Sequence, residues 1–374
     1  MSTIARYQLL NERGETVLEG LARLHPFFPP FVAISTLALC HGVNVYMYQG
    51  LGESCRELAV IFGAPGEGGP VWAWAVGWAI LFWALLKGAA FQQIERIFLV
   101  FLAILSLCLL TAAVLARPDL GAILRGTLGF QLPEQRGAFD PSVVALSLVG
   151  AVAGSLANLM YPYLMREKGW TTPAHRKVQQ YDLALGILVI IVLDLAVWAV
   201  GAEVLHPRGL TVSSTQDLAG LLSQTLGTIG GILIYLGIFA AVGSSLVGNA
   251  LGYSSMATHA VLLWRPELAG GRDYRAHPLY HALVLFALFT PLVWVVLGRS
   301  SFVPLTVTLN AFQVFLLPVL AAGIWILTAS ARFIGAAHRN SLGNNLALGA
   351  FFLVAFLGMC GAGKSLLGNL FQPK

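Results

Sequence analysis

The residues that could carry chemistry in this sequence are few and lie inside long apolar stretches. The clearest group is in residues 140–170, where an uncharged helical segment contains Asn158 and Pro162. Pro162 has no N–H to donate to the carbonyl of Asn158, four residues earlier, and its ring collides with that carbonyl, so we expect the helix to kink or unwind there. In a membrane, such a break persists only where it is buried in protein or faces water. The chemistry it predicts is cation binding by backbone carbonyls and the Asn158 amide, as in the broken helices of secondary transporters.

The same pattern allows a purely structural interpretation, a proline kink in a helix bundle. The freed carbonyl would then be capped by Ser155 or by a neighbouring helix. If the break is functional, Ser155, Tyr161 and Pro162 are residues of the pathway along it. The other apolar stretches must decide between the two interpretations.

Polar pairs interrupt two further apolar stretches. His41 and Asn44 are three residues apart and therefore share one face of a helix. A hydrogen bond between helices and a place in an ion or proton pathway explain this pair equally well. Asn310 and Gln313 also share a face, ahead of Pro318. We assign His41, Asn44 and Gln313 to the predicted pathway.

One carboxylate stands in an otherwise aliphatic segment, Asp194 within residues 190–197. An acid inside a membrane is costly and is normally paired or part of an ion or proton route. We therefore favour a functional role for Asp194.

The composition sets the class of protein. A mean hydropathy of +0.77, with 57% hydrophobic and 10% charged residues, indicates an all-α polytopic membrane protein. The formal charge of +5 comes from Lys and Arg in short loops, which sets membrane orientation and gives no indication of nucleic acid. The four cysteines are scattered, without the close spacing of a zinc or redox site. No metalloprotease helix or nucleophile elbow occurs, so we expect neither an enzyme nor a cofactor.

Nine stretches are long enough to span a bilayer, which needs roughly 20 residues. They are residues 27–50, 71–86, 97–116, 142–165, 183–200, 230–256, 279–297, 302–330 and 345–360. We expect residues 1–26 to form a cytoplasmic segment, 27–363 a single transmembrane bundle and 364–374 a short tail.

The distribution of basic residues predicts the orientation. With nine spans, 14 of the 22 Lys and Arg fall on the side of the N-terminus. This excess places the N-terminus in the cytoplasm and the C-terminus outside, in the inner (plasma) membrane of a bacterium.

Residues 358–365 match the phosphate-binding loop pattern letter for letter. That loop requires a strand before it and a helix after it, whereas this stretch ends a membrane span. We expect no nucleotide there.

Four stretches together resemble the Nramp (natural resistance-associated macrophage protein) family of proton-coupled divalent-metal transporters. Residues 91–96 and 116–126 are similar to its fourth-to-fifth-helix loop and the end of its fifth helix. The broken span resembles its sixth helix, and residues 181–182, Asp194 and His206 resemble its seventh. Asn310 with Pro318, then residues 333–335 and 339–341, resembles its tenth helix and the following loop.

The resemblance implies an inverted repeat of five plus five helices with an extra helix at the end. The nine spans would then be the family's helices three to eleven, and its first helix and most of its second would be absent from the chain as given. That first helix carries an Asp-Pro-Gly-Asn motif whose acid and amide bind the metal. Residues 140–142, Asp-Pro-Ser, precede a different helix and do not replace it.

The site that the resemblance implies is rich in oxygen. The family's Met-Pro-His falls on Ala157-Asn158-Leu159, so the thioether that favours soft metals is replaced by Ala157. The expected ligands are the carbonyls of Ala157 and Asn158, the Asn158 amide, and Asn310 in place of the family's glutamine. Asp194 would supply negative charge. Magnesium, partly hydrated, and manganese both stay open as the cargo.

Three functions follow from these observations. The first is a carrier of a divalent cation that works by alternating access. The second is a symporter of small organic solutes, and the third is a scaffold or sensor descended from a carrier. Because the family's third helix has acids in its proton path where this chain has His41 and Asn44, with Glu53 near the outer end, proton coupling stays open too.

Overall fold

The computed structural model describes residues 1–374 except 87–90, 130–138, 153–155, 272, 299–300 and 372–374. Within these residues the chain forms helices and turns without a strand, and eight helical segments are long and apolar enough to cross a membrane. The predicted all-α polytopic bundle is confirmed. The remaining predicted stretch, residues 71–86, is a shorter apolar helix of 16 residues, Val71–Leu86.

The bounds of the helices follow the apolar stretches. The α-helices are α1 Ser2–Leu10, α2 Val17–Leu24, α3 Phe28–Ile61, α4 Val71–Leu86, α5 Phe91–Ala116, α6 Leu120–Gly129, α7 Pro141–Val152, α8 Tyr161–Glu167, α9 Arg176–Val200, α10 Thr215–Trp264, α11 Pro278–Phe289, α12 Leu292–Val296, α13 Phe302–Gln313, α14 Leu317–Ala329, α15 Ala331–Ile334 and α16 Leu342–Phe371. Short 3-10 segments include η1 Leu156–Met160, η2 Pro173–His175, η6 Tyr274–Ala276 and η7 Val314–Leu316. The phosphate-loop pattern at 358–365 lies inside α16, so it is helix and not a loop.

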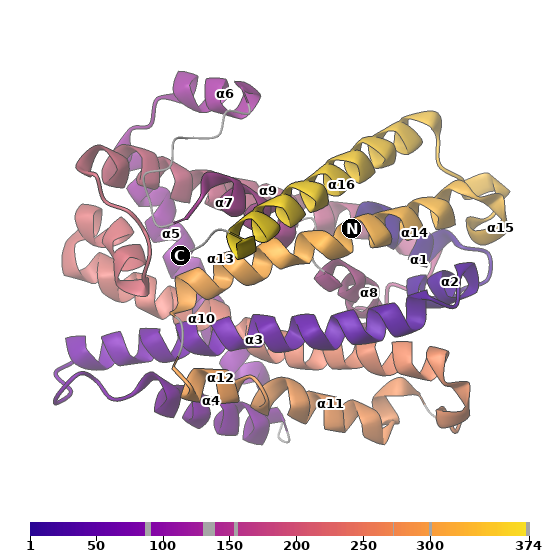
Figure 1. Ribbon diagram of the computed structural model, residues 1–374, viewed down its shortest axis with the longest axis horizontal. Helices are drawn as coiled ribbons and strands as arrows, with labels where there is room; N and C mark the ends of the chain where they lie inside the picture. Colours follow the sequence, from indigo (N-terminus) through magenta and orange to yellow (C-terminus); the bar gives the residue numbers. More distant parts are fainter. Residues whose placement is uncertain (87–90, 130–138, 153–155, 272, 299–300, 372–374) are drawn as a thin grey trace.

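The longest helices, α3 and α10, lie side by side along the long axis of the molecule (Figure 1). α10 extends well beyond the predicted 230–256 at both ends. Its backbone is interrupted at Gly227, where φ is +65° and ψ is −156°, a conformation that favours glycine. The interruption lets one continuous stretch change direction before it enters the bundle.

Two spans are broken in the same way. In each, an α-helix gives way to a 3-10 segment, and a second α-helix follows with proline as its second residue: α7, η1 and α8 with Pro162, and α13, η7 and α14 with Pro318. Proline is tolerated there because the first N–H groups of a helix have no partner within it. The interruption that the sequence predicts before Pro162 is therefore observed.

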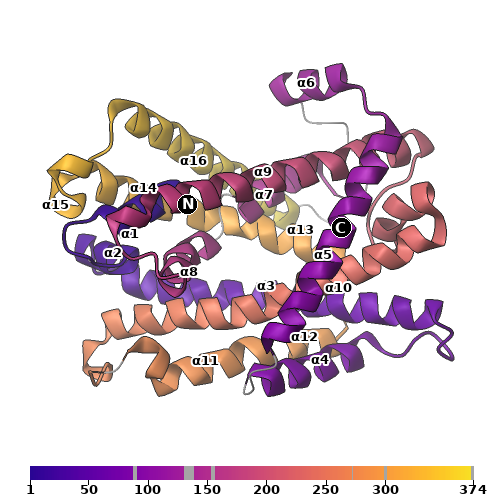
Figure 2. The same cartoon turned by 180° about the vertical axis from the view of Figure 1, so that it is seen from behind.

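Helices α5 and α9 lie on the outside of the bundle, as the view from behind shows (Figure 2). Of the 18 most apolar consecutive residues in the α9 segment, only 17% are buried, and Ile187, Leu188 and Ile191 are exposed. An apolar surface of this extent is typical of a helix that faces lipid.

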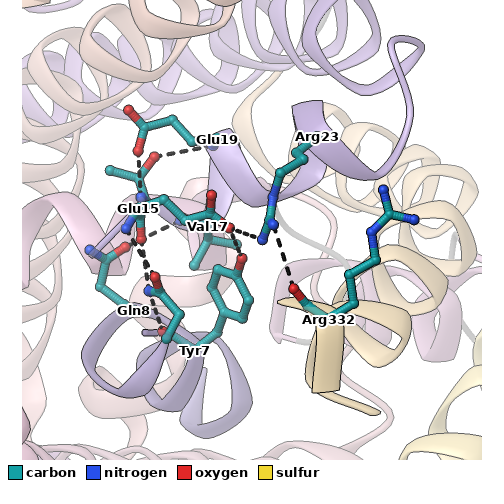
Figure 3. A network of polar contacts seen from close by, with 9 residues as sticks. Tyr7, Gln8, Glu15, Val17, Glu19, Arg23 and Arg332 are labelled. Atoms are coloured by element: carbon teal, nitrogen blue, oxygen red, sulfur yellow. Dashed lines mark hydrogen bonds and ion pairs between the residues drawn. The ribbon is translucent and has the colours of Figure 1, made fainter. Parts of the chain in front are cut away.

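The N-terminal helices close one end of the bundle. α2 begins with a capping box, in which Thr16 and Glu19 each bind the other's backbone N–H. Glu15 accepts hydrogen bonds from Tyr7 of α1 and from Arg23 of α2, which links these two helices (Figure 3). Apolar residues of both helices belong to the same core cluster as the first break, so residues 1–26 pack on the bundle.

Candidate functional site

The first break presents a short 3-10 segment to the middle of the bundle. Ala157 and Asn158 are half-buried within it, and Leu156 and Leu159 are buried. Asn158 lines a cavity of about 100 Å³ together with Ile4 of α1 and Leu317 at the start of α14. The first break therefore opens towards the second broken span.

The second break carries a buried cluster of neutral polar side chains. Gln313 donates from Nε2 to Oδ1 of Asn310 at 2.7 Å, and the Tyr46 hydroxyl of α3 lies 3.5 Å from the same oxygen. Asn310 and Gln313 are 8% and 4% exposed. Oε1 of Gln313 is buried and has no hydrogen-bond partner among the residues that the structure describes, and a buried acceptor of this kind costs about 1–3 kcal/mol unless something satisfies it.

The two broken spans are in direct contact. α7 packs along α13, and Gly150 of α7 lies against the backbone carbonyl of Asn310. A Cβ atom at position 150 would lie 1.9 Å from that carbonyl oxygen, so only glycine fits. This contact places Asn310 where the two broken spans cross.

The structure does not place Asn158 and Asn310 in one cavity. Gln313, the partner of Asn310, lines a groove of about 280 Å³ between α3 and α13, whereas Asn158 lines the cavity beside α1 and α14. Their predicted union in one metal site stays a prediction.

His41 lies on α3 next to α12, away from the Asn310–Gln313 pair. Trp294 donates from Nε1 to Nε2 of His41 at 2.8 Å, and an indole N–H can only donate. Nε2 is therefore unprotonated, and Nδ1 carries the proton 2.9 Å from the Thr290 hydroxyl. His41 is a neutral imidazole here and lines a groove of about 300 Å³.

Asn44, on the same helix, joins three helices through hydrogen bonds. It donates to the Ala287 carbonyl of α11 at 2.9 Å and accepts from Asn249 of α10 at 3.2 Å. Asn44 is fully buried. For Asn44, these contacts favour the first of the two interpretations above, a hydrogen bond between helices.

The remaining predicted residues lie apart from this cluster. Asp194 is exposed on α9, and so its assignment as a metal ligand stays a prediction. The Tyr161 hydroxyl accepts from Gln179 at 3.3 Å and lies 3.3 Å from the Asp182 carboxylate, at the end of the bundle. Pro162 is buried at the start of α8, and Ser155 lies outside the described residues.

Glu53, near the end of α3, was not among the predicted site residues. Its carboxylate accepts from the backbone N–H of Phe302 at 3.1 Å, from Gln49 at 3.0 Å and from the Thr215 hydroxyl. Phe302 and Thr215 are the first residues of α13 and α10, so a buried acid anchors the N-terminal ends of two helices, where negative charge is favoured. An acid inside the apolar stretch was the signal in the sequence, but its partners lie 162 and 249 residues away.

The chemistry available at the breaks is that of neutral oxygen atoms. Within the part of the chain that the structure describes, no three His, Cys, Asp or Glu side chains gather closely enough to hold a metal ion. Amide, hydroxyl and carbonyl oxygens suit hard cations that keep part of their water shell.

The comparisons with known proteins agree with this architecture. The profile of the family described as "Natural resistance-associated macrophage protein-like" matches residues 56–361. The chain is 24% identical over 292 residues to the "Divalent metal cation transporter MntH" of Brucella suis biovar 1 (strain 1330), covering 74% of this chain and 60% of that protein. It is 23% identical over 270 residues to the protein of the same name from Nostoc sp. (strain PCC 7120 / SAG 25.82 / UTEX 2576), covering 68% and 57%.

The chain thus spans about 60% of the length of these curated relatives. The family profile covers most of this chain, including both broken spans with Asn310 and Gln313. The chain therefore belongs to the Nramp family.

Proposed function

We propose that this chain transports a divalent metal cation across a membrane by alternating access. The observation that carries the proposal is the pair of broken spans, in contact at Gly150 and Asn310, with buried oxygen ligands beside them. Broken helices in contact at the middle of a membrane are the usual way in which secondary transporters build ion sites. The relatives named as divalent metal cation transporters support the same cargo.

The candidate ligands are Asn310 and Gln313 at the second break and Ala157 and Asn158 at the first. Gln313 offers a buried acceptor oxygen that has no hydrogen-bond partner, which a cation or its water would satisfy. Because these ligands are neutral, the cation would keep several water molecules, as magnesium does in most protein sites. The end of the bundle with α1, α2 and α8 would face the cytoplasm, as the basic residues predict.

Uptake into proteoliposomes tests the proposal. The purified chain is reconstituted, and uptake of magnesium, manganese and cadmium is followed with an ion-sensitive dye inside the vesicles. Asn310→Ala and Asn158→Ala are compared with Asn344→Ala, a matched control at an exposed position on α16. We expect at least a tenfold loss of uptake for Asn310→Ala and none for the control.

Two outcomes would contradict the proposal. If folded, reconstituted protein moves none of the three ions, the scaffold or sensor interpretation gains support. If uptake occurs but neither substitution changes it, the assigned ligands are wrong.

A further inference from the structure

His259, near the end of α10, is the centre of a cluster that joins four separate elements. Its Nδ1 lies 2.9 Å from the hydroxyl of Tyr163 in α8, and its Nε2 lies 3.8 Å from Oε1 of Glu19 in α2. The ring of Tyr274, in η6, stacks on the imidazole at 5.2 Å with an interplanar angle of 17°. His259 itself is only 8% exposed.

Glu19 is held in place to face His259. Its Oε2 accepts the backbone N–H of Thr16 at 2.5 Å in the capping box of α2 (Figure 3), which leaves Oε1 to face the imidazole. The neighbouring His259 lowers the pKa of the Glu19 carboxyl to about 2. Glu19 therefore stays ionised at every pH at which an imidazole changes its charge.

The other charged groups near the imidazole belong to α8 and to the turn that follows α10. Arg166 lies close enough to act on Tyr163 and Tyr274, and Arg275 lies over the Tyr274 ring. Arg275 is itself paired with Glu167. Glu19 is then the carboxylate that faces the imidazole directly, and Arg166 is a cation beside the two tyrosines that contact it.

The imidazole holds its two partners differently in its two charge states. When protonated, it donates a charge-assisted hydrogen bond from Nδ1 to Tyr163, and its Nε2–H forms an ion pair with the Glu19 carboxylate, 3.8 Å away. When neutral, it has one N–H: if the proton is on Nε2, Tyr163 donates to Nδ1, and if the proton is on Nδ1, no N–H faces Glu19. We propose that His259, Glu19 and Tyr163 form a proton-sensitive latch that holds α8 against α2 and α10.

The latch closes the end of the bundle beneath the first break. Only a cavity of about 10 Å³ separates Val17 and Leu18 of α2 from Leu159 and Pro162 of the broken span. This space holds at most about one water molecule. Because only the protonated imidazole can pair as a cation with the Glu19 carboxylate, the latch should hold more firmly when His259 is protonated than when it is neutral.

The consequence of the latch for transport rests on the proposed function. To open the bundle at the end where α2 and α8 lie, α8 would have to move away from α10. The latch itself can be tested without transport. Hydrogen–deuterium exchange of the full chain in nanodiscs is measured at pH 5.5 and 7.5, corrected for the intrinsic chemical rate. The peptides that cover α2 and α8 report on the latch, and α13 serves as an internal reference.

We expect the protection of α2 and α8 to fall about fivefold between pH 5.5 and 7.5, the difference between a charge-assisted and a neutral hydrogen bond. His259→Gln, which keeps a neutral hydrogen-bonding side chain, should abolish the pH dependence, and Glu19→Gln should reduce it. His281→Gln, an exposed histidine on α11, should behave as the wild type.

The proposal is overturned if wild type and His259→Gln show the same pH dependence in α2 and α8. It is also overturned if Glu19→Gln leaves that dependence unchanged, because Glu19 would then not be the partner. Loss of cation uptake with an intact exchange response would instead contradict the proposed function alone.

Discussion

The two broken spans share one layout but differ in what holds them. Each has a 3-10 segment followed by a helix whose second residue is proline, Pro162 or Pro318. The first break packs on α10 through the flexible side chain of Met160, which lies against Gly252. The second packs on α7 through a backbone carbonyl, that of Asn310 against Gly150. A proline therefore sets where a span breaks, and the neighbouring helix sets how rigidly the break is held.

The starts of the two broken spans also differ in how they are held. The start of α13 is anchored by Glu53, a buried carboxylate from α3 that also binds Thr215. The start of α7 is capped locally by Asp140, an exposed residue that accepts from the backbone of Ser142. We infer that the start of the second broken span is held more firmly than the start of the first.

The largest effect is expected for Gly150→Ala. Its new methyl group would collide with a backbone oxygen, which cannot rotate away, so we expect a loss of about 3 kcal/mol of stability. Thermal unfolding in detergent, followed by tryptophan fluorescence, measures it. Gly186→Ala on α9, where nothing lies within 4 Å, is the matched control and should unfold at or above the wild-type temperature. Equal unfolding temperatures for Gly150→Ala and wild type would show that the two spans are not in this contact.

Removing the anchor of the second span should have the next largest effect. Glu53→Ala leaves the N–H of Phe302 and the hydroxyl of Thr215 without their buried acceptor, and we expect a loss of about 2 kcal/mol. Asp140→Ala, which removes a local and exposed cap, should lower the unfolding temperature less. The reverse order would contradict the idea that the second span is the more firmly held.

A smaller effect is expected from acid at the end of the first span. The pKa of Glu19 is lowered to about 2 by His259, so its contribution to stability is complete above the usual value for Glu, about 4.5, and is lost as the pH falls from 4.5 towards 2. Because the side chain is 41% exposed, solvent screening limits the contribution to about 1 kcal/mol. The unfolding temperature of Glu19→Gln should fall less than that of the wild type over this interval. Parallel curves for the two proteins would argue against the Glu19–His259 pair.

The smallest effect is expected for Gly252→Ala. The added methyl group meets the terminal methyl of Met160, which can adopt another rotamer, so the loss should stay below about 1 kcal/mol. Gly248→Ala, one turn earlier on α10 and in open space, controls for the change in helix propensity. A loss as large as that of Gly150→Ala would show that both breaks are held equally rigidly.

Most of the fold could be predicted from the sequence because apolar length and proline position are local properties. Hydropathy located the membrane-crossing helices, although α3 and α10 extend beyond the predicted stretches by eight residues or more, and the missing N–H of Pro162 located the first break. The second break, before Pro318, has the same signal but was interpreted only as a set of polar residues. The predicted sixth span ended too early because residues 257–264 of α10 include His259, a polar side chain whose partner, Tyr163, lies on another helix.

The candidate site was less predictable because it depends on contacts between distant parts of the chain. Nothing near Gly150 in the sequence shows that it meets Asn310, 160 residues later, and helical spacing alone could not show that Asn44 faces α10 and α11. Position along a helix also could not show that Asp194 is exposed on α9. Pairings between helices, and so the membership of a site, come from packing.

The most direct test of cation binding at the second break is equilibrium titration of the purified chain with manganese, followed by electron paramagnetic resonance of the free ion. Wild type, the double variant Asn310→Ala/Gln313→Ala and the control Asn344→Ala are compared at one pH and ionic strength. We expect the double variant to bind manganese at least tenfold more weakly than the wild type, with the control unchanged. Unaltered affinity in the folded double variant would contradict a cation site at the crossing of the two broken spans.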